Sequence, residues 1–309
     1  MQFIFSFIRK GIPFLLVSLT LIASAQNRVP QEFKPKVVCH LPKEVDETSG
    51  LIFWRNSLWT HNDSGGLPVI YRLDTATGKV VQRITIAGAV NHDWEDISQD
   101  EKYIYIGDMG NNSGNRHNLC IYRVKKSDIP DHGDISVPAE KIAFSYPDYK
   151  GPVKNRRENN FDDEALMAYG DSLYLFSKDW KDQQTRLYAL PKTPGTWTAR
   201  LLLQYNVQGL ITGADHLGSR TVLLTGYTRG TWKPFLVLLT NFSGSHFFSG
   251  NVQRINLRAK ATQIEAVAFA GKNRVFLSSE GRMPAFRQTL YVLGINQLPG
   301  RIKNGKSGN

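Results

Sequence analysis

The stretch at residues 91–112, NHDWEDISQDEKYIYIGDMGNN, decides the fold class of this chain. An acidic segment, DWEDI, is followed by a short polar turn and by the apolar run YIYI, which ends in a Gly/Asn-rich loop. Short apolar runs bounded by turn residues are typical of β-strands. We interpret the stretch as two antiparallel strands that carry polar groups at one end.

The chain repeats this pattern five times. A polar start, a hydrophobic pair, a turn and a three-residue apolar strand recur as ETSGL/LWT, DWEDI/IYI, DDEAL/LYL, ITGAD/VLL and QIEAV/VFL. In this alignment the equivalent residues are Ser49, Glu95, Glu164, Gly213 and Glu265. A repeat of about 40–50 residues with four short strands predicts the blades of a β-propeller.

The remaining apolar runs complete the blades. A third strand is predicted in every repeat, and a fourth in four of them, at residues 80–86, 140–145, 196–203 and 251–257. The last repeat has no fourth strand after it, so we expect residues 36–41 to supply its outer strand and to close the ring without a long exposed edge. The prediction is an all-β propeller over residues 35–298. Five blades are preferred, and six are the alternative because one interval contains two long polar loops.

The two ends of the chain have other signatures. Residues 1–25 combine the basic pair Arg9 and Lys10, an apolar run and the small-residue site Ala23-Ser24-Ala25, as in an export signal. An uncleaved anchor is the alternative, but the apolar run is shorter than the ~20 residues of a membrane span. We therefore predict a periplasmic or extracellular protein, with a linker at residues 26–34 and a basic flexible tail at residues 299–309.

The net charge of +11 raises the question of anionic partners. The basic residues are scattered, and no nucleic-acid-binding motif accompanies them, so we predict a solvated basic surface and no nucleic-acid partner. The expected partner is a small molecule or an envelope polymer. We expect a monomer with no stable membrane span once the signal is removed.

The two cysteines, Cys39 and Cys120, fall in different predicted blades. A disulfide needs Cα atoms within ~7 Å, which that separation excludes. We predict two buried free thiols, and neither belongs to a metal-binding or nucleophile motif.

Polar residues should meet at one mouth of the central channel, because loops that enter first strands and loops that leave second strands open on the same face. The entering set is Glu47, Asn91, His92, Asp93, Glu95, Asp96, Asn160, Asp162, Asp163, Glu164, Thr212, Asp215 and Glu265. The leaving set is His61, Asn62, Asp63, Asp108, Asn111, Asn112, Lys178, Asp179, Tyr227, Glu280 and Arg282.

Three equivalent glutamates, Glu95, Glu164 and Glu265, are expected to point toward one axis. Crowded carboxylates repel one another and lose hydration, so something must offset that cost. One answer is a calcium ion, with Asp96 and Asp215 as further ligands, because calcium takes oxygen ligands of these types. The other answer is structural pairing with backbone N–H groups or basic side chains. Zinc is disfavoured because this set of residues contains no cysteine and the histidines do not have the spacing of a tetrahedral site.

Candidate catalytic residues follow from the same mouth. Asp93 and Asp163 have the chemistry of a general base, and His92 flanks the longest polar loops. Which of these residues meet is not given by their spacing.

Several motifs together resemble a group of exported bacterial β-propeller proteins of mostly unassigned activity. They are HNDSG followed by YRLD, DWEDI with YIGDMGNN, FDDEAL with LYLFSKD, and EAVAF with SSE, and they span nearly the whole chain after residue 25. More distantly, the acidic inner strands are similar to calcium-containing propeller hydrolases of the phytase-like, paraoxonase-like and gluconolactonase-like families. Those families usually have six blades. The resemblance implies a channel calcium and hydrolysis of a phosphoester or lactone.

Two functions remain open at this stage. The first is a calcium-type site at the channel mouth that binds or hydrolyses a small anionic or sugar-like ligand, as a metal-dependent hydrolase if it is an enzyme. The second is a non-catalytic interaction scaffold of the cell envelope. Convergence of the three glutamates on a void would favour the first function, and convergence on basic partners the second.

Overall fold

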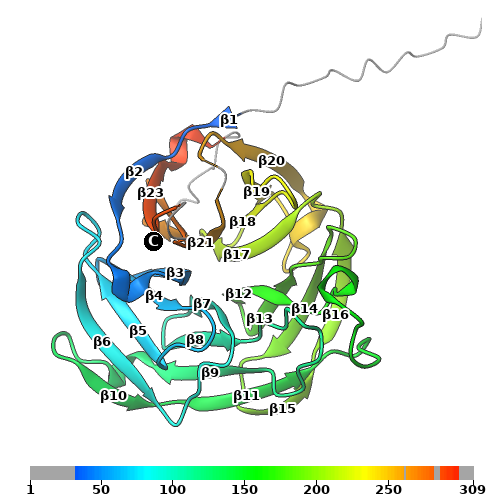
Figure 1. Ribbon diagram of the computed structural model, residues 1–309, viewed down its shortest axis with the longest axis horizontal. Helices are drawn as coiled ribbons and strands as arrows, with labels where there is room; N and C mark the ends of the chain where they lie inside the picture. The colour runs from blue at the N-terminus through cyan, green and yellow to red at the C-terminus, as the bar shows by residue number, and fades with distance from the viewer. Residues whose placement is uncertain (1–31, 261, 282–285, 299–309) are drawn as a thin grey trace, which may run out of the picture.

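Five β-sheets surround one axis in the computed structural model, which describes residues 32–260, 262–281 and 286–298 (Figure 1). The repeats predict this arrangement because each apolar run is too short to bury itself except against neighbouring strands. The predicted five-bladed propeller is confirmed, and the two long polar loops hold no sixth blade within the described residues. The predicted signal at residues 1–25 and tail at residues 299–309 lie outside those residues.

Each blade is built outward from the channel. The inner strands are β3 (Thr48–Trp54), β7 (Trp94–Gln99), β12 (Asp163–Tyr169), β17 (Leu210–His216) and β21 (Ile264–Ala270), and they begin blades 1 to 5. The second strands are β4 (Ser57–Asn62), β8 (Tyr103–Asp108), β13 (Ser172–Ser177), β18 (Thr221–Tyr227) and β22 (Arg274–Ser279). The third strands are β5 (Val69–Leu73), β9 (Cys120–Lys125), β14 (Thr185–Pro191), β19 (Pro234–Thr240) and β23 (Thr289–Gly294).

The fourth strands include one from the start of the chain. They are β6 (Val80–Ala87), β11 (Glu140–Ser145), β16 (Arg200–Tyr205), β20 (Asn251–Leu257) and β2 (Lys36–His40). Strand β2 pairs antiparallel with β23, and Lys36 lies opposite Val292. The predicted closure of the last blade by the N-terminal segment is therefore confirmed.

Three further strands cover the outer edges of blades. They are β1 (Glu32–Phe33), β10 (Ile135–Pro138) and β15 (Gly195–Thr198). Strand β1 runs parallel to β20 of blade 4, β10 to β6 of blade 1, and β15 to β11 of blade 2. In each case the chain pairs with the outer strand of one blade and then continues into the next blade around the ring. The strand predicted at residues 196–203 is thus two strands in different sheets, divided at Ala199. Strand β1 also lies within the segment predicted as a linker. Each covering strand becomes the new, shorter edge of its sheet, and short edges are poor templates for pairing with other chains.

The apolar cores lie between the blades. Five clusters of buried side chains form, each from two neighbouring blades. Trp59 of blade 1 and Trp94 of blade 2 share one cluster, and Leu51 of blade 1 shares another with Phe276 of blade 5. The channel is therefore lined by the inner strands, and its polar residues are free to serve a site.

Short 3-10 turns connect some of the strands. They are η1 (Lys43–Val45), η2 (Lys126–Asp128), η3 (Arg156–Glu158), η4 (Phe247–Ser249) and η5 (Ile295–Gln297). No helix of the described residues has the length and apolarity needed to cross a bilayer.

Both cysteines are free, as predicted. Cys120 is buried in β9, whereas Cys39 in β2 is only partly buried, so the prediction of two buried thiols is wrong for Cys39. Cys39 is more exposed because β2 is the outermost strand of its blade.

Candidate metal centre at the channel mouth

A β-bulge near the start of every inner strand sets the geometry of the mouth. The register between the first and second strands shifts by one residue in all five blades. The residues without a partner are Glu95, Glu164, Thr212, Glu265 and, in β3, the Gly50-Leu51 step. Bulges redirect side chains and are common beside functional sites.

The bulge corrects the alignment of two blades. The sequence pattern placed Ser49 and Gly213 beside the glutamates, but the register places the Gly50-Leu51 step and Thr212 there. In these two blades, where no glutamate occupies the bulge, a side-chain hydroxyl donates a hydrogen bond to a backbone carbonyl of a neighbouring blade. Ser49 Oγ donates to the carbonyl of Glu95, and Thr212 Oγ1 donates to the carbonyl of Ile264 at 2.6 Å.

Carboxylates from three loops and two bulges gather at the mouth. Asp63, Asp93 and Glu95 form one group, and Glu95, Asp162 and Glu164 form another. In each group one ligand atom per residue lies within 4.8 Å of the others. Glu95 belongs to both groups, so it joins the loop after β4 to the start of β12. This arrangement can hold a metal ion.

One buried cation already lies in this cluster. Lys178, directly after β13, is 3% exposed, and its Nζ is 2.7 Å from Glu164 Oε1. Burial lowers the pKa of Lys178, but the surrounding carboxylates, Glu164 first, outweigh this and leave it well above its usual value. Lys178 is therefore charged, and it balances one carboxylate of the five in the two groups.

The carboxylates have strongly perturbed proton affinities. Burial, reinforced by neighbouring negative charge, raises the pKa of Glu95 well above its usual value. Burial also raises the pKa of Asp93 to about 6 and that of Asp162 to about 7. Burial raises the pKa of Glu164 as well, although Lys178 opposes the shift. A divalent cation would reverse these shifts because it favours the ionised forms.

Glu95 has a buried oxygen that accepts no hydrogen bond, although its carboxyl lies beside that of Glu164 and the two can share a proton. Its side chain is 2% exposed, and its Oε1 accepts no hydrogen bond from any described residue. Gly110 lies directly against it, since a Cβ at this position would be 2.0 Å from Oε1 and 2.5 Å from Asp93 Oδ2. A buried carboxylate oxygen without a donor is costly, and a cation would remove that cost.

Asp162 is held in place by donors around it. The backbone N–H of Asn111 donates to Oδ1 at 2.6 Å, and Trp180 Nε1 donates to Oδ2 at 3.0 Å. The loop after β8 and the loop after β13 therefore fix this carboxylate. A ligand fixed by its surroundings needs less reorganisation when a metal binds.

Glu265 lies at the edge of the cluster. Gln263 Nε2 donates to Glu265 Oε1 at 2.7 Å and to Glu280 Oε2 at 3.0 Å, so it bridges the two carboxylates. Glu265 belongs to neither of the two groups that can hold a metal, although its charge reaches Glu164.

Two carboxylates predicted as metal ligands accept backbone hydrogen bonds. Asp96 accepts from the N–H groups of Ile97, Leu166 and Ala214, at 2.8, 2.8 and 3.3 Å, and so links three blades. Asp215 accepts from the N–H of Phe269 at 2.7 Å and lines a pocket at the C-terminal ends of the inner strands. The structure brings neither residue into the two groups.

The candidate catalytic residues are dispersed. Asp93 lies in the cluster and is partly exposed. His92 is exposed and its Nδ1 is 2.9 Å from Asp108 Oδ2, while Arg116 Nη2 pairs with the other oxygen of Asp108 at 2.7 Å. Asp163 is fully buried, and the Tyr146 hydroxyl beside it opposes the burial that raises its pKa. Of the three, only Asp93 shares a group with Glu95.

The sequence placed Asp63 and Lys178 at the mouth without assigning them a role, and it named Asp162 only as a possible general base. The two polar sets meet there in part: Asp93, Glu95, Asp162 and Glu164 of the entering set share the cluster with Asp63 and Lys178 of the leaving set. Asp215 lies at the opposite ends of the inner strands, and Arg282 lies outside the described residues. The bulge and the contact between Lys178 and Glu164 are set by strand register, which residue spacing does not specify.

No known protein family and no curated protein matches this chain. Its fold is similar to that of the PQQ-bound aldose sugar dehydrogenase from Streptomyces coelicolor, with a TM-score of 0.50, 13% identity, and coverage of 86% of this chain and 100% of that one. It is also similar to the galactose-bound exo-β-1,3-galactanase from Phanerochaete chrysosporium, with a TM-score of 0.51 and 11% identity over 84% of this chain and 64% of that one. At these identities the likeness concerns the fold alone. The resemblance to exported propellers and calcium-containing hydrolases stays a prediction.

Proposed function

We propose that the channel mouth binds a calcium-type divalent cation and, with it, a small sugar-like ligand. The observation that carries this proposal is Glu95, which is buried, has an oxygen without a donor and belongs to both carboxylate groups. Five carboxylates share one lysine there, so ionising all five would leave a negative charge that the side chains of the cluster do not balance.

The donor set favours calcium over other metals. All ligand atoms in the two groups are carboxylate oxygens, which suit hard cations. Calcium–oxygen distances of about 2.3–2.6 Å let one ion bridge oxygens up to about 5 Å apart, which matches the 4.8 Å spread of each group. Protein zinc sites are usually built with histidine or cysteine ligands, and neither group contains one.

The ligand class follows from the chemistry of the mouth and from the two fold relatives. Both relatives act on sugars by their names, and sugar hydroxyls are suitable oxygen ligands for calcium. When bound, the cation would orient and polarise a ligand oxygen. Asp93 is partly exposed, and its carboxylate, kept ionised by the cation, can accept a proton from a ligand or a water molecule at the mouth. Hydrolysis of a lactone, a phosphoester or a glycoside is the reaction class to test.

A scaffold role is the second candidate, and Lys178 is the observation that favours it. Its ion pair with Glu164, together with the donors around Asp162, satisfies part of the cluster without a metal. If the remaining carboxylates are protonated, the mouth is a structural feature and the surface loops carry the interaction.

Calcium titration separates the two functions. The protein is stripped with EDTA and titrated with calcium by isothermal calorimetry, alongside Glu95→Gln and the matched control Glu101→Gln, whose side chain is exposed. We expect binding by the parent protein and the control, and at least tenfold weaker binding by Glu95→Gln. Heat that is identical in all three proteins, or absent from the parent, contradicts the cation site.

Lactone, phosphoester and glycoside substrates are then screened with and without calcium. Turnover that needs calcium, and that Asp93→Asn loses even at calcium concentrations that saturate this variant, supports a hydrolase. Calcium binding without turnover supports a binding protein.

A further inference from the structure

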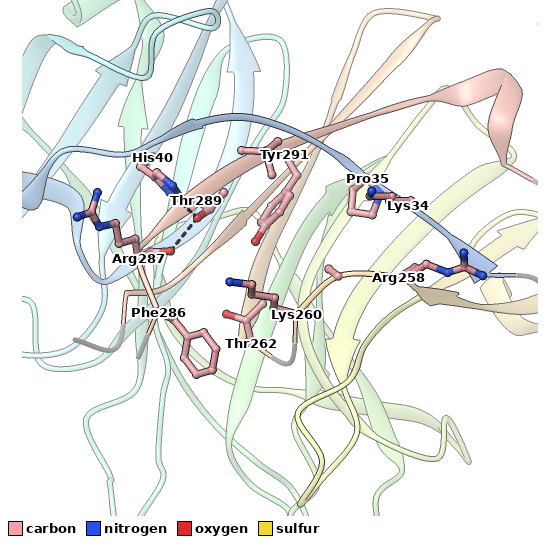
Figure 2. A pocket seen from close by; sticks show the side chains of 12 residues that line it. Lys34, Pro35, His40, Arg258, Lys260, Thr262, Phe286, Arg287, Thr289 and Tyr291 are labelled. Atoms are coloured by element: carbon pink, nitrogen blue, oxygen red, sulfur yellow. Dashed lines mark hydrogen bonds between the residues drawn. The ribbon is translucent and has the colours of Figure 1, made fainter. Parts of the chain in front are cut away.

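A pocket of about 580 Å³ lies on the rim of the propeller, outside the acidic mouth (Figure 2). Three parts of the chain surround it: the segment leading into β2, the segment after β20 and the segment before β23. Its volume is in the range of small-molecule sites, about 300–1,000 Å³.

The charge of this rim pocket is of one sign. Its ionisable lining side chains include Lys34, Arg258, Lys260 and Arg287, together with His40, and none of its lining residues is acidic. A cavity lined by charges of one sign has a positive potential, which attracts an anion.

Most of these cations have no internal counter-ion. Arg258 pairs with Glu32 at 3.2 Å, but the two side chains are 72% and 49% exposed, so this pair is weak. Lys34, Lys260 and Arg287 form no ion pair within the residues that the structure describes. They remain available to a ligand.

The polar groups are directed by fixed neighbours. Figure 2 shows the ammonium of Lys260 between the hydroxyls of Tyr291 and Thr262, whose side chains are largely buried. The Thr289 hydroxyl donates to the carbonyl of Arg287 at 2.7 Å, and His40 Nδ1 contacts the same hydroxyl at 3.0 Å. These contacts tie the segment that carries Arg287 to β2, so the pocket has built walls.

Apolar surface lies beside the charges. Val37, Phe286 and Tyr291 line the same cavity. Thr262 and Phe286 also line a smaller pocket with Glu280, whose carboxylate belongs to the rim of the acidic mouth. One wall is therefore shared between the basic pocket and the mouth.

We propose that the rim pocket binds a small organic anion, in which a carboxylate or phosphate is attached to a ring or short apolar body. Lys260 holds the charged group through a charge-assisted hydrogen bond, with the hydroxyls of Tyr291 and Thr262 beside its ammonium, and Phe286 and Tyr291 contact the body (Figure 2). This site is independent of the cation proposed for the mouth.

Three sugars that differ in one group test the proposal. Glucose, glucose 6-phosphate and glucuronate are titrated into the protein by isothermal calorimetry in EDTA, so that no divalent cation takes part. We expect the two charged sugars to bind, glucose not to bind, and the affinity to fall as salt rises. Binding of only one charged sugar supports the proposal and assigns the anion class.

Lys260→Gln is compared with Lys272→Gln, which removes the same charge from an exposed position outside the pocket. We expect at least tenfold weaker binding for Lys260→Gln, the parent affinity for Lys272→Gln, and equal melting temperatures. Arg287→Gln should weaken binding less than Lys260→Gln, because the guanidinium of Arg287 is turned away from the ammonium of Lys260 (Figure 2). Equal weakening by Lys260→Gln and Lys272→Gln, or no binding of either charged sugar at millimolar concentration, overturns the proposal.

Discussion

Replacing Lys178 with methionine tests the electrostatics of the channel mouth. The side chain is 3% exposed and lies 2.7 Å from Glu164 Oε1, with the other carboxylates of the cluster around it. Methionine keeps much of the volume and removes the charge. Removing one partner of a buried ion pair costs about 3–5 kcal/mol of unfolding free energy, because the other charge stays buried without compensation.

The melting temperature should fall accordingly in EDTA. A loss of 1 kcal/mol lowers the melting temperature by about 2–4 °C in large domains, so Lys178→Met should melt about 6–20 °C lower than the parent. Calcium should recover much of this loss, since it binds the folded protein and supplies the missing positive charge. Thermal unfolding followed by circular dichroism measures both effects.

Two controls make the result specific. Lys181→Met removes an exposed lysine three residues away and should change the melting temperature by little. The double variant Lys178→Met/Glu164→Gln should regain part of the loss, because it removes both members of the pair. A fall below about 1 kcal/mol in EDTA, or a Lys178→Met protein that calcium does not stabilise, would refute the reasoning.

Three further predictions concern the same region. Asp96→Ala should lower the free energy of unfolding by at least about 2 kcal/mol in urea denaturation, because three backbone N–H groups lose their acceptor. The same variant should keep the calcium affinity of the parent protein. A loss of calcium binding would instead make Asp96 a metal ligand. Gly110→Ala should weaken calcium binding at least tenfold in calorimetry, because its Cβ would lie 2.0 Å from Glu95 Oε1. Gly66→Ala is the control, since its Cβ would make no contact below 3.5 Å. Equal calcium affinities of the two variants would show that the loop around Gly110 moves to accommodate the methyl group. In EDTA, the free energy of unfolding should fall as pH rises from about 4 to 7, because burial raises the pKa of Asp162 to about 7 and the folded protein keeps protons that the unfolded chain releases. Saturating calcium should reverse the slope of unfolding free energy against pH, measured by urea denaturation over the same range. Parallel curves with and without calcium would exclude a cation at these carboxylates.

Much of the fold was predictable because it depends on periodic features of the chain. The five repeats fixed the inner strands, and the missing strand of the last repeat pointed to the N-terminal segment that becomes β2. The edge strands β10 and β15 were not predicted as such, because a strand that runs along a neighbouring blade has no pattern of its own in the repeat.

The candidate site was predictable in composition and only partly in geometry. The glutamates were identified from their repeated position, and Glu95 and Glu164 do lie together. Thr212 was expected at the mouth, but Gly213 was aligned with the glutamates in its place, because a bulge adds one residue to the strand without changing the types of residue around it. The role of Asp96 was also hidden, since backbone donors from other blades are not written in local sequence.

The cores between blades have a consequence for how the chain is made. Each blade buries its two faces only against neighbours, so a single blade has no core of its own. The face of blade 1 that carries Leu51 stays open during synthesis until blade 5 arrives with Phe276, and β2 has no partner until Thr289–Gly294 has left the ribosome. We expect the nascent protein to carry an exposed apolar face until its last blade is released, and a chain truncated before β23 to aggregate.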